Sequence, residues 1–196
     1  MSGFKVISME SLLSGGEDAV WEAVGDFSCR YNPEIDSYLH NRSVDFTRKS
    51  MTVTHLVFDD VMGLCVGYFA LTHKPVIFHA DILSGSQRKR IERFSKLDEE
   101  TKCYTVSAFL IAQIGKNYLA QNGELISGVA LLDLAKDELL VAKQKIGGQI
   151  VFVEMEHGNE QLAKFYADNG FVPFGSRDDI ENGKPITYDQ LFLFLK

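Results

Sequence analysis

The spacing of apolar residues changes along this chain from a strand period to a helix period and back. YTVSAFLIAQIG is a long apolar run rich in β-forming residues, which predicts a central strand covered on both faces. GVALLDLAKDELLVAKQ repeats apolar residues every three or four positions and predicts a helix. The remainder is predicted to form a strand, a short helix and two strands: GGQIVFVEME, NEQLAKFYADNGF, GFVPFG and YDQLFLFLK.

The first half of the chain predicts a different order of elements. GFKVIS reads as a short strand and GEDAVWEAVGDF as a helix, and Pro33 can begin a second helix. A hairpin follows, with arms Thr52 to Phe58 and Leu64 to Thr72 and turn residues between them. Helices alternate with strands only in the second half, so we expect an α/β domain with a mixed sheet, a single domain over residues 1–196.

One polar segment, residues 79–102, interrupts this pattern. It contains a basic cluster followed by an acidic run, and we interpret it as an inserted loop or helix. It is either a solvated connector or an element that faces a substrate or partner. The basic cluster comprises Arg88, Lys89, Arg90 and Arg93, and the acidic run comprises Asp98, Glu99 and Glu100.

Composition narrows the classes of function. The net charge of −7 disfavours general nucleic-acid binding and mildly favours a cationic substrate. The N-terminal residues do not show the basic region followed by an apolar stretch that marks a signal peptide, and no apolar run reaches membrane-spanning length. We therefore expect a soluble cytoplasmic protein without membrane contact. Three widely spaced cysteines suggest free thiols, with Cys65 in the core, and five scattered histidines predict no metal site.

The junction between the long strand and the long helix, Gln113 to Gly128, is the first candidate site. A helix N-terminus offers free N–H groups and a favourable dipole to an anion such as phosphate. Gly123 lies in the connecting loop, and the helix begins near Ser127 and Gly128, where a missing side chain lets a ligand approach the backbone. The alternative is that Gly128 is small only to allow the helix to pack on the sheet.

The short helix near the C-terminus is the second candidate site. Asn159 is a good N-cap and Gly170 a good residue after the helix end. Phe165 is expected in the core, and Tyr166 beside it is either a core residue or a group in a cleft. On the preceding strand Glu154 and Glu156 face the same side, which is either a solvated edge or a cleft.

Along the chain, the segment KFYADNGFVPFG follows a long apolar strand, a loop at a helix start and a second strand. This order and this segment resemble the GNAT superfamily of acyl-CoA-dependent N-acetyltransferases. The similarity runs from Val106 to Phe174. FSCRYNPEIDSYLHNRSVDF and the hairpin after it resemble the small bacterial and mobile-element branch, some of whose members are toxins of toxin–antitoxin pairs. The resemblance covers most of the chain apart from His79 to Lys102.

The resemblance implies a mostly antiparallel mixed sheet, helices on both faces, and two parallel strands, Val106 to Ile114 and Gln149 to Glu156, that splay apart. It also implies that the pantetheine arm of acetyl-CoA lies in the gap between those strands like an added strand. A backbone N–H around Ile114 would polarise the thioester carbonyl.

The remaining roles carried over from the family concern single residues. The pyrophosphate would sit on amides near Ile126, Ser127 and Gly128, Asn159 would contact the pantetheine arm, and Tyr166 would protonate the leaving sulfur. The general base is not identified; Glu154 and Glu156 are the first candidates, and Tyr68 and His55 follow them.

The pyrophosphate loop departs from the family pattern. The family usually has Gln or Arg, two residues, Gly, one residue, then Gly or Ala, and here those positions fall on Gly123, Ile126 and Gly128. Two functions therefore stay open: an N-acetyltransferase that moves an acetyl group from acetyl-CoA to a primary amine, and a catalytically impaired GNAT-fold binding module. A toxin-type enzyme acting on aminoacyl-tRNA is a third, and the resemblance also leaves a homodimer and an antitoxin partner open.

Overall fold

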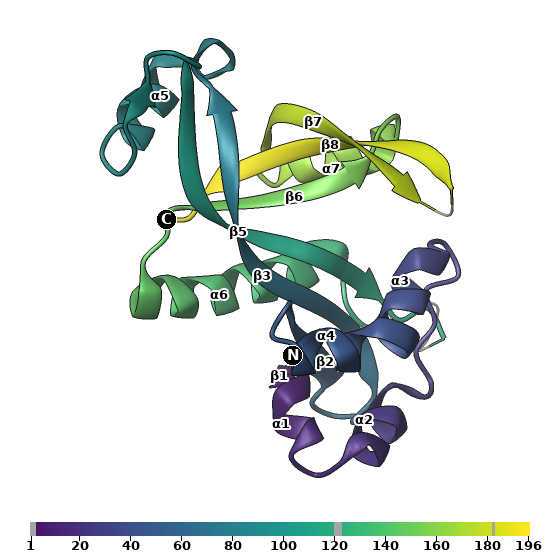
Figure 1. Ribbon diagram of the computed structural model, residues 1–196. Helices are drawn as coiled ribbons and strands as arrows, with labels where there is room; N and C mark the ends of the chain where they lie inside the picture. Colours follow the sequence, from purple (N-terminus) through teal and green to yellow (C-terminus); the bar gives the residue numbers. More distant parts are fainter. Residues whose placement is uncertain (1–2, 120–122, 182) are drawn as a thin grey trace. The chain divides into compact units, whose positions relative to one another are not determined.

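The computed structural model describes residues 3–119, 123–181 and 183–196 (Figure 1). The first half of the chain begins with a short strand and then forms a run of short helices before the hairpin. These elements are β1 (Phe4–Ser8), α1 (Met9–Leu13), α2 (Glu17–Val24), α3 (Pro33–Ser37), the π-helical η1 (Tyr38–Arg42), α4 (Ser43–Arg48), β2 (Val53–Asp59) and β3 (Cys65–His79).

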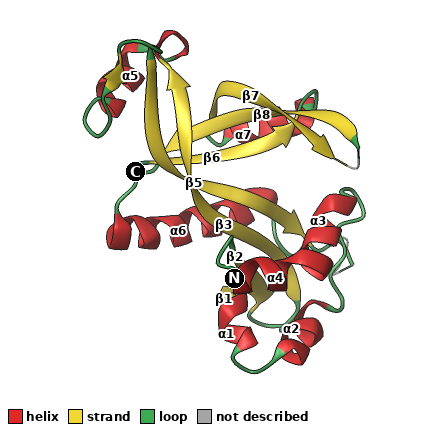
Figure 2. Cartoon of the chain, viewed as in Figure 1, coloured by secondary structure: helices red, strands yellow, loops and turns green. Residues whose placement is uncertain are grey.

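The second half alternates strands and helices, as Figure 2 shows by colour. Its elements are η2 (Ala80–Ile82), α5 (Gly85–Ile91), β4 (Leu97–Asp98), β5 (Cys103–Lys116), α6 (Gly128–Ile146), β6 (Ile150–Glu156), α7 (Glu160–Asp168), β7 (Val172–Glu181) and β8 (Lys184–Phe194).

Local sequence explains where several of these helices begin. Asn32 caps α3 by accepting a hydrogen bond from the Glu34 amide, and Pro33 supplies the first helical residue. Ser84 and Gln87 form a reciprocal capping box at the start of α5. The basic segment that was predicted as a loop or helix therefore contains a capped helix of two turns.

The described strands form an open sheet in the order β1-β2-β3-β5-β6-β8-β7, with β4 beside β5. β5 and β6 pair in parallel, through Phe109 with Val151 and Leu110 with Phe152. The pairs β1/β2, β2/β3, β6/β8 and β7/β8 are antiparallel. This arrangement confirms the predicted fold class, a mixed and mostly antiparallel sheet with one parallel pair.

Internal contacts group the residues into two compact units. Unit 1 comprises the chain up to Thr72 together with Ile111–Ala142, and unit 2 comprises His73–Leu110 together with Lys143–Lys196. β3, β5 and α6 contribute residues to both. The single domain over residues 1–196 stays a prediction.

Each unit has its own apolar core. In unit 1 the short helices pack on β2 and β3, around buried side chains such as Met9, Val20, Leu39 and Leu56. In unit 2 a cluster of aromatic rings links β3, β6, β7 and β8, and its ring centroids lie 4.6 to 6.3 Å apart. Its members are Phe78, Phe152, Phe174 and Phe192. Edge-to-face rings of this kind stabilise a core beyond their buried area.

Three strands are longer than the sequence pattern predicted. β3 continues beyond Thr72 to His79, and β7 and β8 extend as a polar hairpin through residues for which no element was predicted. Among the helices of the described residues, none is both long enough and apolar enough to cross a membrane.

Candidate functional site

The start of α6 is built as the sequence predicted. The Ser127 hydroxyl accepts a hydrogen bond from the Ala130 amide at 3.0 Å, and the Ser127 carbonyl accepts one from the Leu131 amide at 3.0 Å, so Ser127 is the N-cap. The N–H groups of Gly128 and Val129 belong to the first helical turn, where no intrahelical acceptor exists. Ser127 is exposed and Gly128 is half-buried, so an anion can reach these amides.

The loop before α6 contains the two residues that depart from the family pattern. Gly123 has φ +75°, and a Cβ there would lie 2.8 Å from Cδ1 of Tyr118, so both backbone and space require glycine. The Ile126 side chain is 2% exposed and anchors the loop in the core. Ile126 can therefore offer a ligand only its backbone. Ile114 is half-buried and lies two residues before the end of β5.

Asn117, which follows β5 directly, is a site residue that the sequence did not reveal. The residue is 3% exposed, and its side-chain amide uses all four of its hydrogen-bonding positions. Oδ1 accepts from the amides of Ser28 (3.1 Å) and Leu119 (2.9 Å), and Nδ2 donates to the carbonyls of Asp26 and Cys65, both at 2.8 Å. One amide thus joins the loop before α3 to the ends of β3 and β5.

α7 has the predicted caps. The Asn159 side chain accepts a hydrogen bond from the Leu162 amide at 3.0 Å, and Gly170 has φ +85°, which lets the Phe171 amide donate back to the Tyr166 carbonyl. Since the Asn159 carbonyl oxygen is used in capping, its amide nitrogen is the group left for a ligand.

The two aromatic residues of α7 differ in burial. Tyr166 is 3% exposed, whereas Phe165 is half-buried, so the expectation that Phe165 is the core residue was wrong in part. The Tyr166 ring meets Phe165 and Phe171 edge-on, each at 5.4 Å between centroids. None of the described residues forms a hydrogen bond with its hydroxyl, and burial raises the pKa of Tyr166. The hydroxyl is therefore protonated at neutral pH.

Glu154 and Glu156 have different surroundings. Arg177 donates to both carboxylate oxygens of Glu154, at 2.8 and 2.9 Å, and Gln190 donates to one at 2.7 Å. Burial raises the pKa of Glu154, but these hydrogen bonds outweigh it and the net pKa is lowered. A carboxylate held in this way is a weak proton acceptor. Glu156 is exposed at the end of β6.

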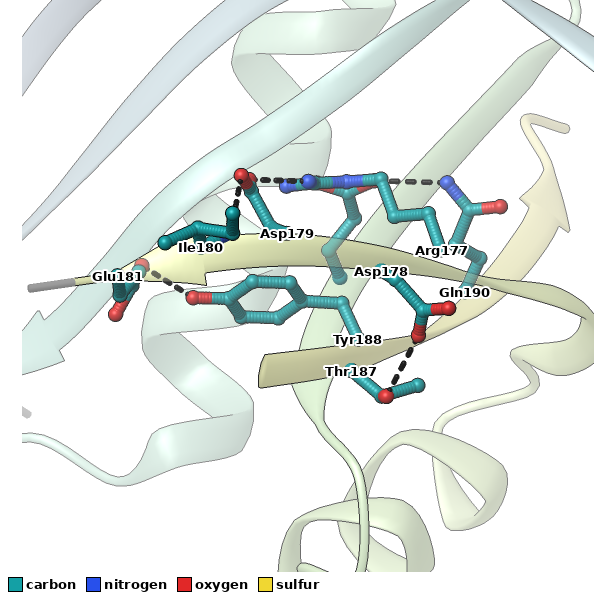
Figure 3. A network of polar contacts seen from close by, with 9 residues as sticks. Arg177, Asp178, Asp179, Ile180, Glu181, Thr187, Tyr188 and Gln190 are labelled. Carbon is teal, nitrogen blue, oxygen red and sulfur yellow. Dashed lines mark hydrogen bonds and ion pairs between the residues drawn. The ribbon is translucent and has the colours of Figure 1, made fainter. Parts of the chain in front are cut away.

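The polar network around Arg177 continues along the β7–β8 hairpin (Figure 3). Arg177 also pairs with Asp179 at 2.5 Å, and its guanidinium lies 4.8 Å from the centroid of the Tyr188 ring. The Thr187 hydroxyl donates to Asp178 at 2.7 Å. Within this network one guanidinium, that of Arg177, meets two carboxylates, those of Glu154 on β6 and Asp179 on β7.

The two remaining candidates for the base, Tyr68 and His55, lie in unit 1. Tyr68 is fully buried, donates to the Ile35 carbonyl at 2.7 Å, and has a pKa raised by burial. Burial lowers the pKa of His55, and this effect is larger than the opposite one of the Glu138 carboxylate, which lies 3.9 Å from Nε2 of the ring. The His55 ring also stacks on Phe69. A tyrosine committed to a backbone carbonyl is a poor base, whereas His55 is a neutral imidazole.

The cysteines are free thiols, and burial raises the pKa of Cys65 to about 12, which fits its predicted place in the core. Cys103 lies 3.2 Å from Nδ1 of His79. Within residues 3–119, 123–181 and 183–196, no three side chains of the metal-binding types gather.

The predicted site residues thus fall into two sets. Unit 1 contains Ile114 on β5, together with Gly123, Ile126, Ser127 and Gly128 in the loop before α6 and at its start. Unit 2 contains Glu154, Glu156, Asn159 and Tyr166, on β6 and α7. The first set consists of backbone donors and the second of titratable or polar side chains.

Comparison with solved structures identifies the fold as that of the GNAT acetyltransferases. AtaT complexed with acetyl-methionyl-tRNA is similar with a TM-score of 0.62 and 17% identity, over 95% of this chain and 95% of that one. AtaTR bound with acetyl-CoA is similar with a TM-score of 0.58 and 16% identity, over 98% and 93%.

A tyrosine-to-phenylalanine variant of KacT is similar with a TM-score of 0.60 and 16% identity, over 95% of this chain and 94% of that one. At these identities the similarity concerns the fold. No protein-family model and no curated protein sequence matches the chain. The expectation that nucleic acid is disfavoured gains no support, because AtaT was solved with a tRNA.

Proposed function

We propose that this chain is an N-acetyltransferase that moves an acetyl group from acetyl-CoA to an amine by direct attack in a ternary complex. The observation that carries the proposal is the exposed start of α6, where Ser127 caps the helix and the amides of Gly128 and Val129 are left without intrahelical acceptors. A pyrophosphate suits such a group of donors. The GNAT fold, and its occurrence in a structure with acetyl-CoA, support the same cofactor.

In the proposed reaction the neutral amine attacks the thioester carbonyl, and the C–S bond breaks as the new C–N bond forms. A base removes one proton from the amine nitrogen, and the leaving thiolate takes one proton from Tyr166. Tyr166 suits the donor role because its hydroxyl is protonated and is not engaged by any other described residue. Its raised pKa makes complete transfer to a thiolate of pKa about 8.5 uphill, so we propose that the proton moves while the C–S bond breaks.

For the base we propose Glu156 ahead of Glu154. Glu154 is held by Arg177 and Gln190, so protonating it would weaken three hydrogen bonds. Glu156 is exposed and can act directly or through water. His55, a neutral imidazole, is the next candidate.

The acceptor has two candidates. The net charge of −7 favours a small cationic amine. A second candidate, the amine of an aminoacyl-tRNA, is favoured by exposed aromatic and basic side chains in unit 1 and by the tRNA bound to AtaT. The rival function, a binding module without catalysis, rests on the altered loop at Gly123 and Ile126.

Calorimetric titration with acetyl-CoA tests the proposal. We expect saturable binding by the wild type and at least a tenfold weaker affinity in Ser127→Asp, because a carboxylate keeps the helix capped but repels the pyrophosphate. Ser84→Asp is the matched control, since it makes the same change at the N-cap of α5. No heat from the wild type at millimolar acetyl-CoA, or equal affinities in both variants, would contradict the proposed site.

A further inference from the structure

A hollow of about 430 Å³ lies within unit 2, between the distal part of β3 and residues of β6, β7 and β8. Every second side chain of β3 faces these strands. Phe78 is fully buried and packs on Phe174 at 4.6 Å between ring centroids, and Val76 is 5% exposed. Lys74 is the next residue of this row and is exposed, so it lies on the face of β3 that is turned toward the hollow.

The floor of the hollow is apolar. The Phe152 and Phe174 rings, which belong to residues 3% and 6% exposed, lie 6.3 Å apart between centroids. A bulge in β7 between Pro173 and Gly175 makes Phe174 an extra residue opposite β8, and bulges re-aim side chains in this way. Because Gly175 has no side chain, space is left beside the Phe174 ring for an apolar group of a small ligand.

One wall of the hollow holds a carboxylate in a fixed position. The Glu154 side chain is 17% exposed and receives hydrogen bonds from Arg177 and Gln190. Its Oε1 accepts two of these and its Oε2 accepts one, so Oε2 keeps a lone pair. Oε1 of Gln190 accepts no hydrogen bond from the described residues. These two oxygens are acceptors suited to an ammonium group.

Lys74 faces this carboxylate without reaching it. Its positive charge contributes to the lowered pKa of Glu154, which burial alone would raise. No carboxylate of the described residues lies within 4.0 Å of the Lys74 ammonium group. One hollow is thus lined by an unpaired ammonium from β3 and a carboxylate from β6. A ligand that carries both charges satisfies both groups, whereas an anion or a cation leaves one of them unpaired.

We infer that this hollow binds a free α-amino acid with an apolar side chain. The ligand carboxylate pairs with Lys74, its ammonium donates to Oε2 of Glu154 and Oε1 of Gln190, and its side chain lies on the rings of Phe152 and Phe174. A volume of about 430 Å³ is in the range of pockets that hold small molecules.

The bound amino acid is also the acceptor of the acetyl group, and this role, unlike the binding itself, rests on the proposed function. Glu156, the proposed base, lies two residues after Glu154 on the same face of β6. An amino acid that is esterified to RNA has no carboxylate for Lys74. The hollow therefore favours a small amine over an RNA-linked amine.

Calorimetric titration of the full chain with L-leucine, without acetyl-CoA, tests the binding site. Lys74→Gln should weaken leucine binding by about 10- to 150-fold, the equivalent of about 1.5–3 kcal/mol for a hydrogen bond to a charged group. Lys89→Gln removes an exposed charge of α5 in the same unit and is the matched control, so it should bind leucine as the wild type does.

Two analogues of leucine separate its two charges. Leucinamide lacks the carboxylate, so it should bind more weakly than leucine, and Lys74→Gln should change its affinity by less than about twofold. 4-Methylpentanoate lacks the ammonium and should bind about tenfold more weakly than leucine, or worse. No leucine binding by the wild type at millimolar concentration, or equal affinity for leucine and either analogue, would overturn the inference. So would a loss of leucine binding in Lys89→Gln as large as that in Lys74→Gln.

Failure of the proposed function has a different signature. With acetyl-CoA and leucine present, mass spectrometry should detect N-acetyl-leucine. If leucine binds through Lys74 and no N-acetyl-leucine forms, the binding site stands and the role of leucine as acceptor is wrong. If the chain acetylates another amine and leucine does not bind, the proposed function stands and the amino-acid site is wrong.

Discussion

The two units organise their polar groups in opposite ways. In unit 1 a buried, uncharged amide, Asn117, satisfies four backbone groups, and the groups free for ligands are exposed amides and rings. In unit 2 a charged residue, Arg177, joins Glu154 of β6 to Asp179 of β7, so its single positive charge is already matched by carboxylates. The difference suggests that unit 1 supplies binding groups, whereas unit 2 supplies titratable ones.

The largest expected effect is on the turnover number and comes from a residue of unit 2. Tyr166→Phe should lower kcat by about 10²- to 10⁴-fold, the range for loss of a general acid. The free energy of unfolding should be unchanged or slightly higher, because the deleted hydroxyl has no hydrogen-bond partner among the described residues and the buried ring is kept. Steady-state kinetics and urea unfolding measure both. A fully active Tyr166→Phe would return this tyrosine to the core.

The next effect lies in unit 1, in stability. Asn117→Ala should lower the free energy of unfolding by about 2–4 kcal/mol, because it leaves buried backbone donors and acceptors unpaired. Asn41→Ala removes an exposed amide with one long hydrogen bond, at 3.4 Å, and should change stability by at most about 0.5 kcal/mol. Urea unfolding compares the two. Equal losses would show that Asn117 does not organise unit 1 as described.

Sequence alone predicted the elements that depend on local pattern. The apolar run of β5, the three- and four-residue repeat of α6, the Ser127 start and the Asn159 and Gly170 caps all follow from neighbours in the chain. The hub at Asn117 could not be predicted, since its partner Ser28 is 89 residues away. An asparagine directly after a buried strand was the only local sign of it.

The polar hairpin shows a second limit. The distal parts of β7 and β8 contain charged residues without an apolar face, so the sequence there does not show the alternation of apolar and polar residues that predicts a strand. Their pairing depends on cross-strand partners such as Thr187 and Asp178. The deeper burial of Tyr166 relative to Phe165 has a similar cause. Neighbours on a helix point about 100° apart, and only tertiary packing decides which one faces the core.

The smallest expected effect depends on pH and lies in unit 2. A hydrogen bond from the His157 ring to the Asp189 carboxylate raises the pKa of the exposed His157 above its ordinary 6.5. The pair therefore stabilises the fold fully below pH 6.5, and this contribution is lost as pH rises through the raised pKa. His157→Gln should lower the thermal midpoint slightly at pH 5.5 and leave it unchanged at pH 8.5. An equal difference at both pH values would contradict a charged pair.

The central claim is that acetyl-CoA binds at the exposed start of α6, and amide chemical shifts of ¹⁵N-labelled protein test it most directly. On titration with acetyl-CoA, the amides of Gly128 and Val129 should shift strongly and saturate together, in the wild type and in Ser84→Asp. In Ser127→Asp the same shifts should require at least tenfold more ligand. If acetyl-CoA binds while these two amides stay unmoved, or if no amide of the protein responds, the account of the site is wrong.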